Sequence, residues 1–221
     1  MTPIALNRTL CIIPARAGSR RIPGKNMKPF FGKPIIQYSI EKALESDLFD
    51  EVVVSTDSIE TAEFAERFGV AGVLRPRHLA EDAVGTQEVA SNLLNAAGQG
   101  FDLVCVIYAT APLMSLQDLR RGYEILSSDS ALDYVFSVAY DHLTDGGWQY
   151  TDVGQFYWNR AAALLEGKPL SGPTAYRLPI SPHRACDINT PEDWALAERL
   201  FLALPENRDS ARKEIGHEIR Y

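Results

Sequence analysis

The sequence lacks several features that mark whole classes of protein. It has no run near the roughly 18 consecutive apolar residues that a membrane-spanning helix needs. Its first residues, MTPIALNRTLCII, contain no basic segment followed by an apolar stretch and a small-residue cleavage site, which argues against secretion. The 22 lysines and arginines are outnumbered by 29 aspartates and glutamates, so no basic surplus is available to neutralise a nucleic-acid backbone. We therefore expect a cytoplasmic protein that binds neither membranes nor nucleic acids.

Cysteine and histidine are also scarce. The three cysteines form no C-x-x-C pair, and Cys11 and Cys105 lie inside apolar runs, which is typical of buried thiols in a reducing compartment. The four histidines show neither the spacing of a metal site nor partners that would define a Ser-His-Asp arrangement. The sequence therefore argues against a disulfide scaffold, a zinc site and a serine-hydrolase triad.

Short apolar segments alternate with segments of helical periodicity along the first 140 residues. The spacing predicts strands over 9–14, 51–57, 70–76, 102–108 and 133–139, and helices over 33–46, 58–69, 86–100 and 115–128. Because the central strands show no polar alternation, we expect a mostly parallel, Rossmann-like α/β sheet with helices on both faces, in a single domain over 1–205. Ligands of such sheets bind beyond the carboxyl ends of the strands.

The segment 137–180 is less regular than the part of the chain before it. We expect a strand near 155–158 and one or two short strands in AYRLPISPHRACDI. Thr190 and Pro191 predict the start of a final helix, because they fit an N-cap and a first helical position. The inner face of this helix would carry Trp194, Ala197, Phe201 and Leu204. The tail 206–221 is polar and charged.

A basic loop follows the first predicted strand. The segment PARAGSRRIPGKN (14–26) contains glycines that let a ligand approach the backbone, and it bears four cations: Arg16, Arg20, Arg21 and Lys25. Directed N–H groups together with mobile positive charge suit a triphosphate. The loop matches neither G-x-x-x-x-G-K-[ST] nor G-x-G-x-x-G, and a solvated basic loop is the alternative reading.

Six ordered motifs link this loop to a known family. ARAGSRRIPGKN with KPFFGKP, VSTDS, VLRPRHLAEDAVGT, YATAPL and DINTPEDW run in order from 10 to about 200. This pattern resembles the cytidylyltransferases that activate nine-carbon acidic sugars, the CMP-sialic acid synthetases and their relatives. DVGQFYW with PEDW is most similar to the pseudaminic acid branch. The resemblance implies the nucleotide-diphospho-sugar transferase type of fold.

The resemblance also implies a reaction in which CTP and a nonulosonic acid give a CMP-sugar and pyrophosphate, with Mg²⁺ as cofactor. Lys25 and Arg16 would be the catalytic cations, with Lys25 stabilising charge on the α-phosphate. The backbone near 83–85 would help to frame the cytidine. The implied nucleotide-binding residues are Ala15, Arg16, Gly18, Ser19, Arg20, Lys25, Asn26, Arg75 and Thr86.

Acceptor and metal contacts are implied by the later motifs, and the resemblance makes the less regular segment 137–180 the region of acceptor and subunit contacts. Tyr108 would face the acceptor sugar, although a tyrosine at the end of so apolar a strand also fits a core position. Gln155 and Tyr157 lie on the strand predicted near 155–158 and are further acceptor-binding residues, while Asp187 and Asn189 are the implied metal ligands. Asp57 could contact the ligand, but the interpretation favoured by its place at a strand end is a cap of the next helix.

The chain departs from the family pattern at two places. Relatives have Asp-x-Asp where this chain reads Asp187-Ile-Asn189, and an amide supplies an oxygen without charge, so weaker metal binding is expected. The segment HLTDGGWQYT is shorter than in relatives, where it carries arginines and a part that exchanges between subunits. A homodimer is therefore less strongly implied here, and Arg177 or Arg184 becomes an alternative partner for the sugar carboxylate.

Three interpretations of function remain open from the sequence. The leading one is a cytidylyltransferase for pseudaminic acid. The same reaction with sialic, legionaminic or an eight-carbon acid sugar is the second. A CTP-binding protein without turnover is the third, motivated by Asn189 and by the short segment before DVGQFYW.

Overall fold

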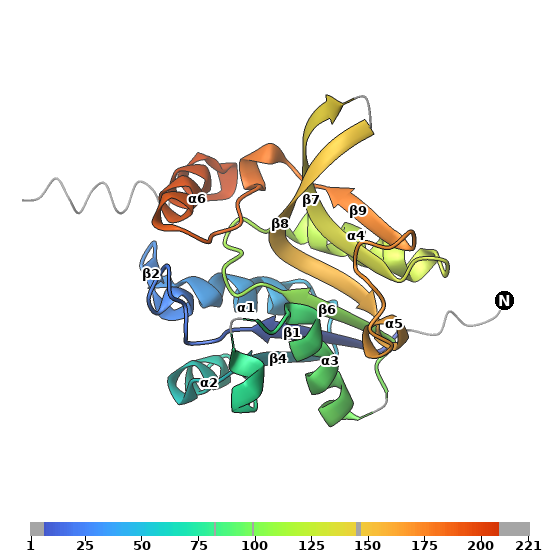
Figure 1. Ribbon diagram of the computed structural model, residues 1–221. Helices are drawn as coiled ribbons and strands as arrows, with labels where there is room; N and C mark the ends of the chain where they lie inside the picture. The colour runs from blue at the N-terminus through green and yellow to red at the C-terminus, as the bar shows by residue number, and fades with distance from the viewer. Residues whose placement is uncertain (1–6, 82, 99, 145–146, 208–221) are drawn as a thin grey trace, which may run out of the picture.

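A seven-stranded sheet forms the centre of the protein (Figure 1). The computed structural model describes residues 7–81, 83–98, 100–144 and 147–207. The strand order is β5-β4-β1-β6-β8-β7-β9, and β8 alone runs antiparallel to its neighbours β6 and β7. The prediction of a mostly parallel sheet is therefore confirmed. Its strands are β1 (Thr9–Pro14), β4 (Glu51–Thr56), β5 (Ala71–Leu74), β6 (Leu103–Ile107), β7 (Tyr134–Thr144), β8 (Gly147–Arg160) and β9 (Ala175–Pro179).

Helices cover both faces of this sheet, because side chains alternate between the faces along each strand. Cys11 and Ile13 of β1 pack in one core with α1, α2 and α4, whereas Leu10 and Ile12 pack in a second core with α3 and α5. Burial on both faces explains why β1 and β6 read as unbroken apolar runs. The helices are α1 (Ile35–Glu45), α2 (Ile59–Glu66), α3 (Thr86–Ala97), α4 (Leu116–Ser128), α5 (Ala161–Leu165) and α6 (Pro191–Ala203).

The strands β7 and β8 form a long hairpin that extends past the rest of the sheet (Figure 1). Strands were predicted only over 133–139 and near 155–158, so the regular part of this region is longer than the sequence indicated. The segment HLTDGGWQYT contains turn-forming residues, so its sequence did not indicate the alternation of apolar and polar residues that is typical of strands. Residues 145–146, which connect them, lie outside the described part of the chain, as does 208–221 of the predicted tail.

The final helix begins as predicted. The Thr190 side chain accepts a hydrogen bond from the Asp193 amide, and the Asp193 carboxylate accepts one from the Thr190 amide, which completes a capping box. A third core joins this helix to the segment after the basic loop, where the Phe30 ring lies 5.4 Å from that of Trp194 and 5.3 Å from that of Phe201. The predicted inner face is buried in full: Trp194, Ala197, Phe201 and Leu204.

Several short elements lie outside the main sheet and its helices. A two-stranded ribbon, β2 (Pro29–Phe30) with β3 (Lys33–Pro34), follows the first of the 3₁₀ turns. These turns are η1 (Lys25–Met27), η2 (Arg77–Ala80), η3 (Pro182–Arg184) and η4 (Pro205–Asn207). The three cysteines are buried, as expected for Cys11 and Cys105. Within the described residues, no helix has the length and apolar character to cross a membrane.

Candidate active site

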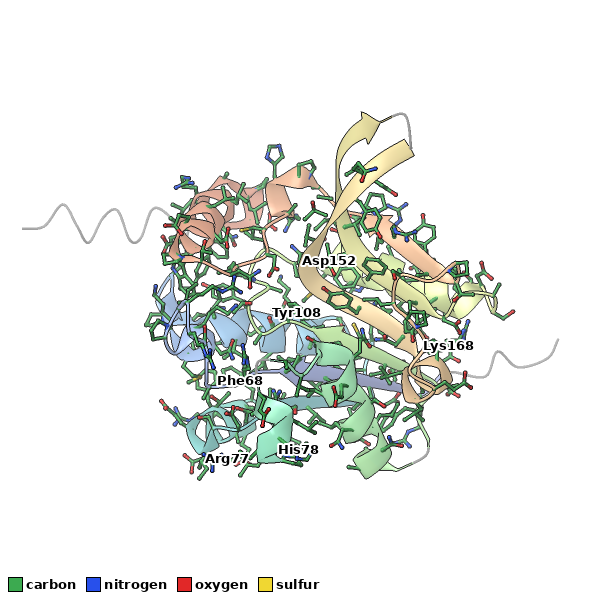
Figure 2. The ribbon with its side chains drawn as sticks, in the orientation of Figure 1. Phe68, Arg77, His78, Tyr108, Asp152 and Lys168 are labelled. Atoms are coloured by element: carbon green, nitrogen blue, oxygen red, sulfur yellow. The ribbon has the colours of Figure 1, made fainter. Side chains whose placement is uncertain are left out.

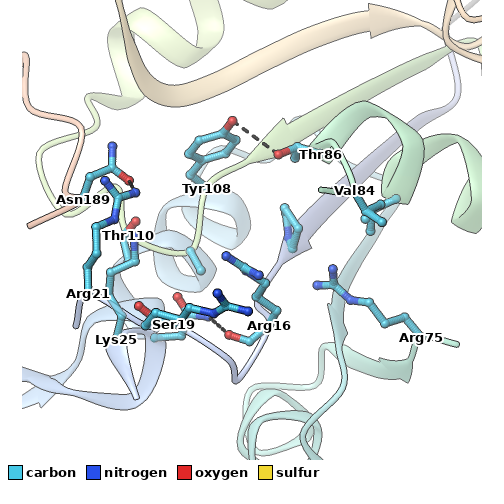
Figure 3. A pocket seen from close by; sticks show the side chains of 15 residues that line it. Arg16, Ser19, Arg21, Lys25, Arg75, Val84, Thr86, Tyr108, Thr110 and Asn189 are labelled. Carbon is cyan, nitrogen blue, oxygen red and sulfur yellow. Dashed lines mark hydrogen bonds between the residues drawn. The ribbon is translucent and has the colours of Figure 1, made fainter. Parts of the chain in front are cut away.

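A cavity of about 520 Å³ opens beyond the carboxyl ends of β1 and β6 (Figure 3). It joins the basic loop to the start of α3 and to the segment before α6. A second hollow of about 670 Å³ shares Arg16, Ser19 and Arg20 with it and is also lined by Gly18, Ala80, Glu81 and Ala83. The first cavity is lined by Pro14, Arg16, Ser19, Arg20, Arg21, Lys25, Asn26, Arg75, Val84, Thr86, Val89, Tyr108, Ala109, Thr110 and Asn189.

Hydrogen bonds from β4 and from the loop itself fix the path of the basic loop. The Ala15 amide donates to the Ser55 carbonyl at 2.8 Å, and the Thr56 hydroxyl donates to the Ala15 carbonyl at 2.6 Å. Asn26, predicted to frame the cytidine, donates its side-chain amide to the Arg16 carbonyl at 2.9 Å. Ala15 is fully buried, so its part in the site is to hold the loop against β4. These hydrogen bonds hold the start of the loop against β4, while Gly18, Arg20 and Arg21 in its middle are exposed.

Asp57 corrects one expectation. The cap of α2 is Ser58, whose hydroxyl accepts from the Thr61 amide at 3.2 Å. The Asp57 carboxylate instead accepts a hydrogen bond from the Ala17 amide at 2.7 Å. A carboxylate can accept from a loop amide as readily as from a helix amide, and the sequence gives no means of choosing the Ala17 amide, 40 positions from Asp57, over the amides of the next helix.

Lys25 lies at the base of the cavity, in η1. Its ammonium group donates to the Ile188 carbonyl at 2.6 Å, so it connects the basic loop to the segment before α6. Burial lowers the pKa of Lys25, and Asp187 opposes this effect. The nearby charges of Arg21 and Arg16 lower the pKa further. Cations therefore crowd together at this end of the cavity.

The opposite wall holds Arg75 and Thr86. Arg75 donates to the carbonyls of Ser55 and Leu79, and its Nε is buried with no hydrogen-bond partner among the described residues. Burial lowers the pKa of Arg75, Asp57 opposes the shift, and the charge of Arg16 adds to it. In Figure 3 the guanidinium groups of Arg16 and Arg75 point into the cavity from two sides.

Of the three residues predicted to bind the acceptor, Tyr108 lines the cavity. Its hydroxyl accepts from Thr86 at 3.4 Å, as the dashed line in Figure 3 shows. Tyr157 and Gln155 are 3% and 1% exposed, so both lie beneath the surface of β8. The Gln155 side-chain amide donates to the Arg184 carbonyl at 2.5 Å. The structure therefore brings Tyr108 to the cavity and places Tyr157 and Gln155 behind it.

The two predicted metal ligands contact each other. Asn189 donates its amide to Asp187 at 2.5 Å, while its side-chain oxygen accepts from Arg21 at 3.1 Å. Burial raises the pKa of Asp187, although the hydrogen bond from Asn189 and the charge of Lys25 act in the opposite direction. Among the described residues no group of three or more acidic, histidine or cysteine side chains could hold a metal.

Mg²⁺ in phosphate-transfer sites commonly takes one or two carboxylates together with substrate oxygens. Asp187 fits this pattern, because its burial penalises negative charge that a cation would offset. Asn189 fits less well in this geometry, since its oxygen already accepts from Arg21.

Arg177 and Arg184 differ in their surroundings. Arg184 donates to the Leu113 carbonyl at 3.1 Å and forms an ion pair with Glu206. Arg177 lies over the ring of Tyr150 at 4.6 Å, and its Nε is buried without a hydrogen-bond partner in the described chain. Arg177 is therefore the better placed of the two for an added carboxylate.

Two residues that the sequence did not single out contact Tyr157 or approach Tyr108. Asp152 accepts from the Tyr157 hydroxyl at 2.7 Å and from the Gly154 amide at 2.9 Å. A Cβ at Gly154 would lie 2.8 Å from the Asp187 carboxylate and 3.2 Å from the Tyr108 ring. Both residues belong to the DVGQFYW motif, but only its last residues were predicted to lie in a strand.

A cation-lined cavity beyond the first strand of a mostly parallel sheet suits a nucleoside triphosphate, and the family model and the relatives identify the class as nucleotidyltransferase. The chain belongs to the cytidylyltransferase family, whose model matches residues 10–145. It is 34% identical to a pseudaminic acid cytidylyltransferase of Campylobacter jejuni, over 92% of this chain and 99% of the relative. It is 33% identical to a CMP-N,N'-diacetyllegionaminic acid synthase of Legionella pneumophila, over 88% and 96%.

Solved structures support the fold. A CMP:2-keto-3-deoxy-manno-octonic acid synthetase, in a structure with CTP, matches with a TM-score of 0.73 and 17% identity, over 89% of this chain and 99% of that one. A 4-diphosphocytidyl-2C-methyl-D-erythritol synthase of Anaerococcus prevotii matches with a TM-score of 0.65 and 13% identity, over 87% and 97%. At these identities the likeness concerns the fold alone.

Proposed function

We propose that this chain transfers CMP from CTP to a nonulosonic acid, with pseudaminic acid as the acceptor, and releases pyrophosphate. The name of the Campylobacter jejuni relative supports the choice of acceptor, because the match covers almost all of both chains. The observation that carries the proposal is the convergence of cations on one cavity in a protein of net charge −7. A triphosphate would relieve their mutual repulsion.

The basic loop would hold the triphosphate. Arg16 and Arg20 provide charged donors, and Ser19 adds a hydroxyl at the point where both hollows meet. Arg75 and Thr86 lie on the wall across from this loop, where the nucleoside part of CTP would extend. The second hollow beside Gly18 has room for the outer phosphates, and a Cβ at Gly18 would meet no protein atom within 4 Å.

The reaction needs positioning and charge stabilisation more than a strong base. A hydroxyl oxygen of the acid sugar bonds to the α-phosphorus, the bond from that phosphorus to the oxygen bridging to the β-phosphate breaks, pyrophosphate leaves, and the hydroxyl proton passes to water. Lys25 is placed to stabilise the added negative charge, since its ammonium is held at the cavity base by the Ile188 carbonyl. Arg16, between Lys25 and Arg75, would stabilise the same charge.

Mg²⁺ is the proposed cofactor. Asp187 would be its protein ligand, and the ion would supply charge neutralisation for the leaving pyrophosphate. Asn189 holds Asp187 through its side-chain amide and Arg21 through its oxygen, so it orients both partners.

Arg177 is the proposed partner of the acceptor's carboxylate. A row of rings leads from the cavity toward it: Tyr108 lies 5.1 Å from Tyr157, which stacks on Phe136 at 6.1 Å. Phe136 contacts Tyr150, whose ring lies beneath the Arg177 guanidinium. Tyr157 and Phe136 are buried, so Tyr150, which is 36% exposed beside Arg177, is the ring of this row that the apolar face of a deoxy sugar could contact.

Pyrophosphate release, measured with CTP, Mg²⁺ and a panel of acid sugars, tests the proposal. We expect the highest kcat/KM with pseudaminic acid. Higher values with legionaminic, sialic or an eight-carbon acid sugar would keep the reaction but replace the acceptor. Calorimetric binding of CTP without turnover across the panel would instead favour a CTP-binding protein, the reading that Asn189 in place of a second aspartate motivates.

A further inference from the structure

We propose that the hydroxyl of Thr110 donates a hydrogen bond to the α-phosphate of bound CTP. This inference rests on the proposed function and adds a ligand contact to the same cavity, at a residue outside both the basic loop and the metal motif. Thr110 is almost completely buried, and yet it forms part of the cavity wall.

The Thr110 hydroxyl is available to a ligand. The residue is 6% exposed, and among the buried serines and threonines of the described chain it alone lines the cavity. Its side chain points into the cavity in Figure 3. The hydroxyl has no hydrogen-bond partner among the described residues. Because an unpaired polar group in a buried place costs free energy, a ligand that accepts from this hydroxyl would be favoured.

Nearby hydroxyls have a structural use that Thr110 lacks. Ser39 of α1 donates to the Tyr108 carbonyl at 2.7 Å, and Thr56 at the end of β4 donates to the Ala15 carbonyl at 2.6 Å. Both bonds hold the backbone beside the cavity. Thr110 makes no such bond, so the fold does not depend on its hydroxyl.

The segment that carries Thr110, between β6 and α4, is fixed on both sides. The Tyr108 amide donates to the Gln155 carbonyl at 2.9 Å, and the Met114 amide donates to the Ala111 carbonyl at 3.2 Å. Figure 2 labels Tyr108, which marks where the segment leaves the sheet. Since threonine is branched at Cβ and its surroundings are packed, few directions are open to its hydroxyl before a ligand binds.

The place of Thr110 in the cavity selects the α-phosphate. In Figure 3 it lies on the side that carries Arg21 and Lys25, whereas Arg75 lies on the opposite side, where the nucleoside would extend. Phosphate oxygens are attracted to the cationic side. The outer phosphates would lie in the second hollow beside Gly18, which Thr110 does not line. The α-phosphate, joined to the nucleoside, is therefore the phosphate within reach of this hydroxyl.

A neutral donor suits this position. Lys25 and Arg21 each donate one hydrogen bond to the segment before α6, so their positive charges are already crowded here. A hydroxyl adds a directed donor to an anion without adding another charge, and such bonds are short and strong. Negative charge on the α-phosphate oxygens would be stabilised by this fixed donor as the sugar hydroxyl attacks.

Calorimetry with CTP and with CMP, both in the presence of Mg²⁺, tests the contact. Thr110→Val replaces the hydroxyl by a methyl group, so we expect the affinity for both nucleotides to fall about tenfold, because both contain the α-phosphate. Thr110→Ser keeps a hydroxyl and should retain most of the affinity. Thr61→Val, at a buried threonine of α2 outside the cavity lining, is the matched control and should bind both nucleotides as the wild type does.

Phosphorus NMR identifies the contacted group without turnover. The resonance of protein-bound CMP should differ between the wild type and Thr110→Val but not between the wild type and Thr61→Val. Unchanged affinities in Thr110→Val, a loss for CTP alone or an unmoved resonance would overturn the inference, because the contact would then be absent or lie on another group. If the wild type binds CTP but turns over no acid sugar, the proposed function fails while the same data still decide the inference. A wild type that binds neither nucleotide would overturn both.

Discussion

The carboxylate of Asp57 accepts a hydrogen bond of 2.7 Å from the backbone amide of Ala17, and so connects the end of β4 to the basic loop after β1. A charge-assisted bond of this kind is stronger than a neutral one. It lies beside the cavity and sets the path of the backbone between Arg16 and Ser19. The end of β4 therefore helps to hold the loop that would bind the triphosphate.

Asp57→Ala should weaken CTP binding about tenfold, because the loop amide loses its partner and the loop gains freedom. Isothermal titration with CTP measures the effect. Ser58→Ala is the control: it removes the cap of α2 and should cost about 1 kcal/mol in the free energy of unfolding, with CTP affinity unchanged. The reverse pattern, with Ser58→Ala affecting CTP and Asp57→Ala only stability, would contradict this role of Asp57.

Lys25→Ala should lower kcat by roughly 10² to 10³, the usual cost of removing a group that stabilises transition-state charge. The far-UV circular dichroism spectrum should stay unchanged, because Lys25 makes its side-chain hydrogen bond to a single carbonyl, that of Ile188. Lys42→Ala, at a surface lysine paired with Glu45, is the matched control and should retain full activity. Near wild-type turnover by Lys25→Ala would remove this residue from the mechanism.

Gly154→Ala should reduce activity as well as stability. The residue has φ +59°, and an added Cβ would meet the Asp187 carboxylate at 2.8 Å. Gly167→Ala separates the two effects, because Gly167 has φ +65° but open space around its Cβ position. Both variants should lose about 1 kcal/mol of stability through backbone strain, while Gly154→Ala alone should lose turnover. Equal activities in the two variants would show that the close approach to Asp187 is unimportant.

Asn189→Asp should lower the Mg²⁺ concentration that gives half-maximal rate. A carboxylate at this position adds the negative charge that Mg²⁺ prefers, and it keeps an oxygen that can accept from Arg21. Titrating Mg²⁺ at saturating CTP measures the change. If this Mg²⁺ concentration does not change, Asn189 does not contact the metal ion or its ligands.

Asp133 predicts a pH-dependent stability. Burial acts to raise its pKa, but hydrogen bonds from Thr174 at 2.8 Å and Lys168 at 3.2 Å outweigh it and hold the pKa below the usual value. A depressed carboxyl pKa stabilises the fold above the pKa of the unfolded chain, and this stabilisation disappears as the pH falls through the folded-state pKa. Asp133→Asn should therefore lower the free energy of unfolding at neutral pH but leave it unchanged in strong acid. Urea unfolding of both proteins at the two pH values measures the difference.

Local pattern was enough to predict much of the fold. The unbroken apolar runs predicted β1 and β6, and the N-cap signal of Thr190 and Pro191 predicted the start of α6. The basic loop was also correctly placed beyond the first strand. These features depend on residues close together in the chain, where spacing, caps and burial act directly.

Features that depend on distant partners could not be predicted. The hydrogen bond between Arg21 and Asn189 spans 168 positions, and that between Ala17 and Asp57 spans 40. Strand β8 bulges at residues 153–156, where its pairing with β7 shifts in register. Because this bulge depends on the partner strand, the sequence did not reveal that Gln155 would be buried against the Arg184 carbonyl.

The most direct test of the account is a crystal structure of the protein with CTP and Mg²⁺. We predict that the triphosphate lies against the loop 15–26, with its α-phosphate near the Lys25 ammonium and its cytidine toward Arg75 and Thr86. A nucleotide bound elsewhere, with Arg16 and Lys25 facing only solvent, would contradict the claim that this loop exists to hold a nucleoside triphosphate.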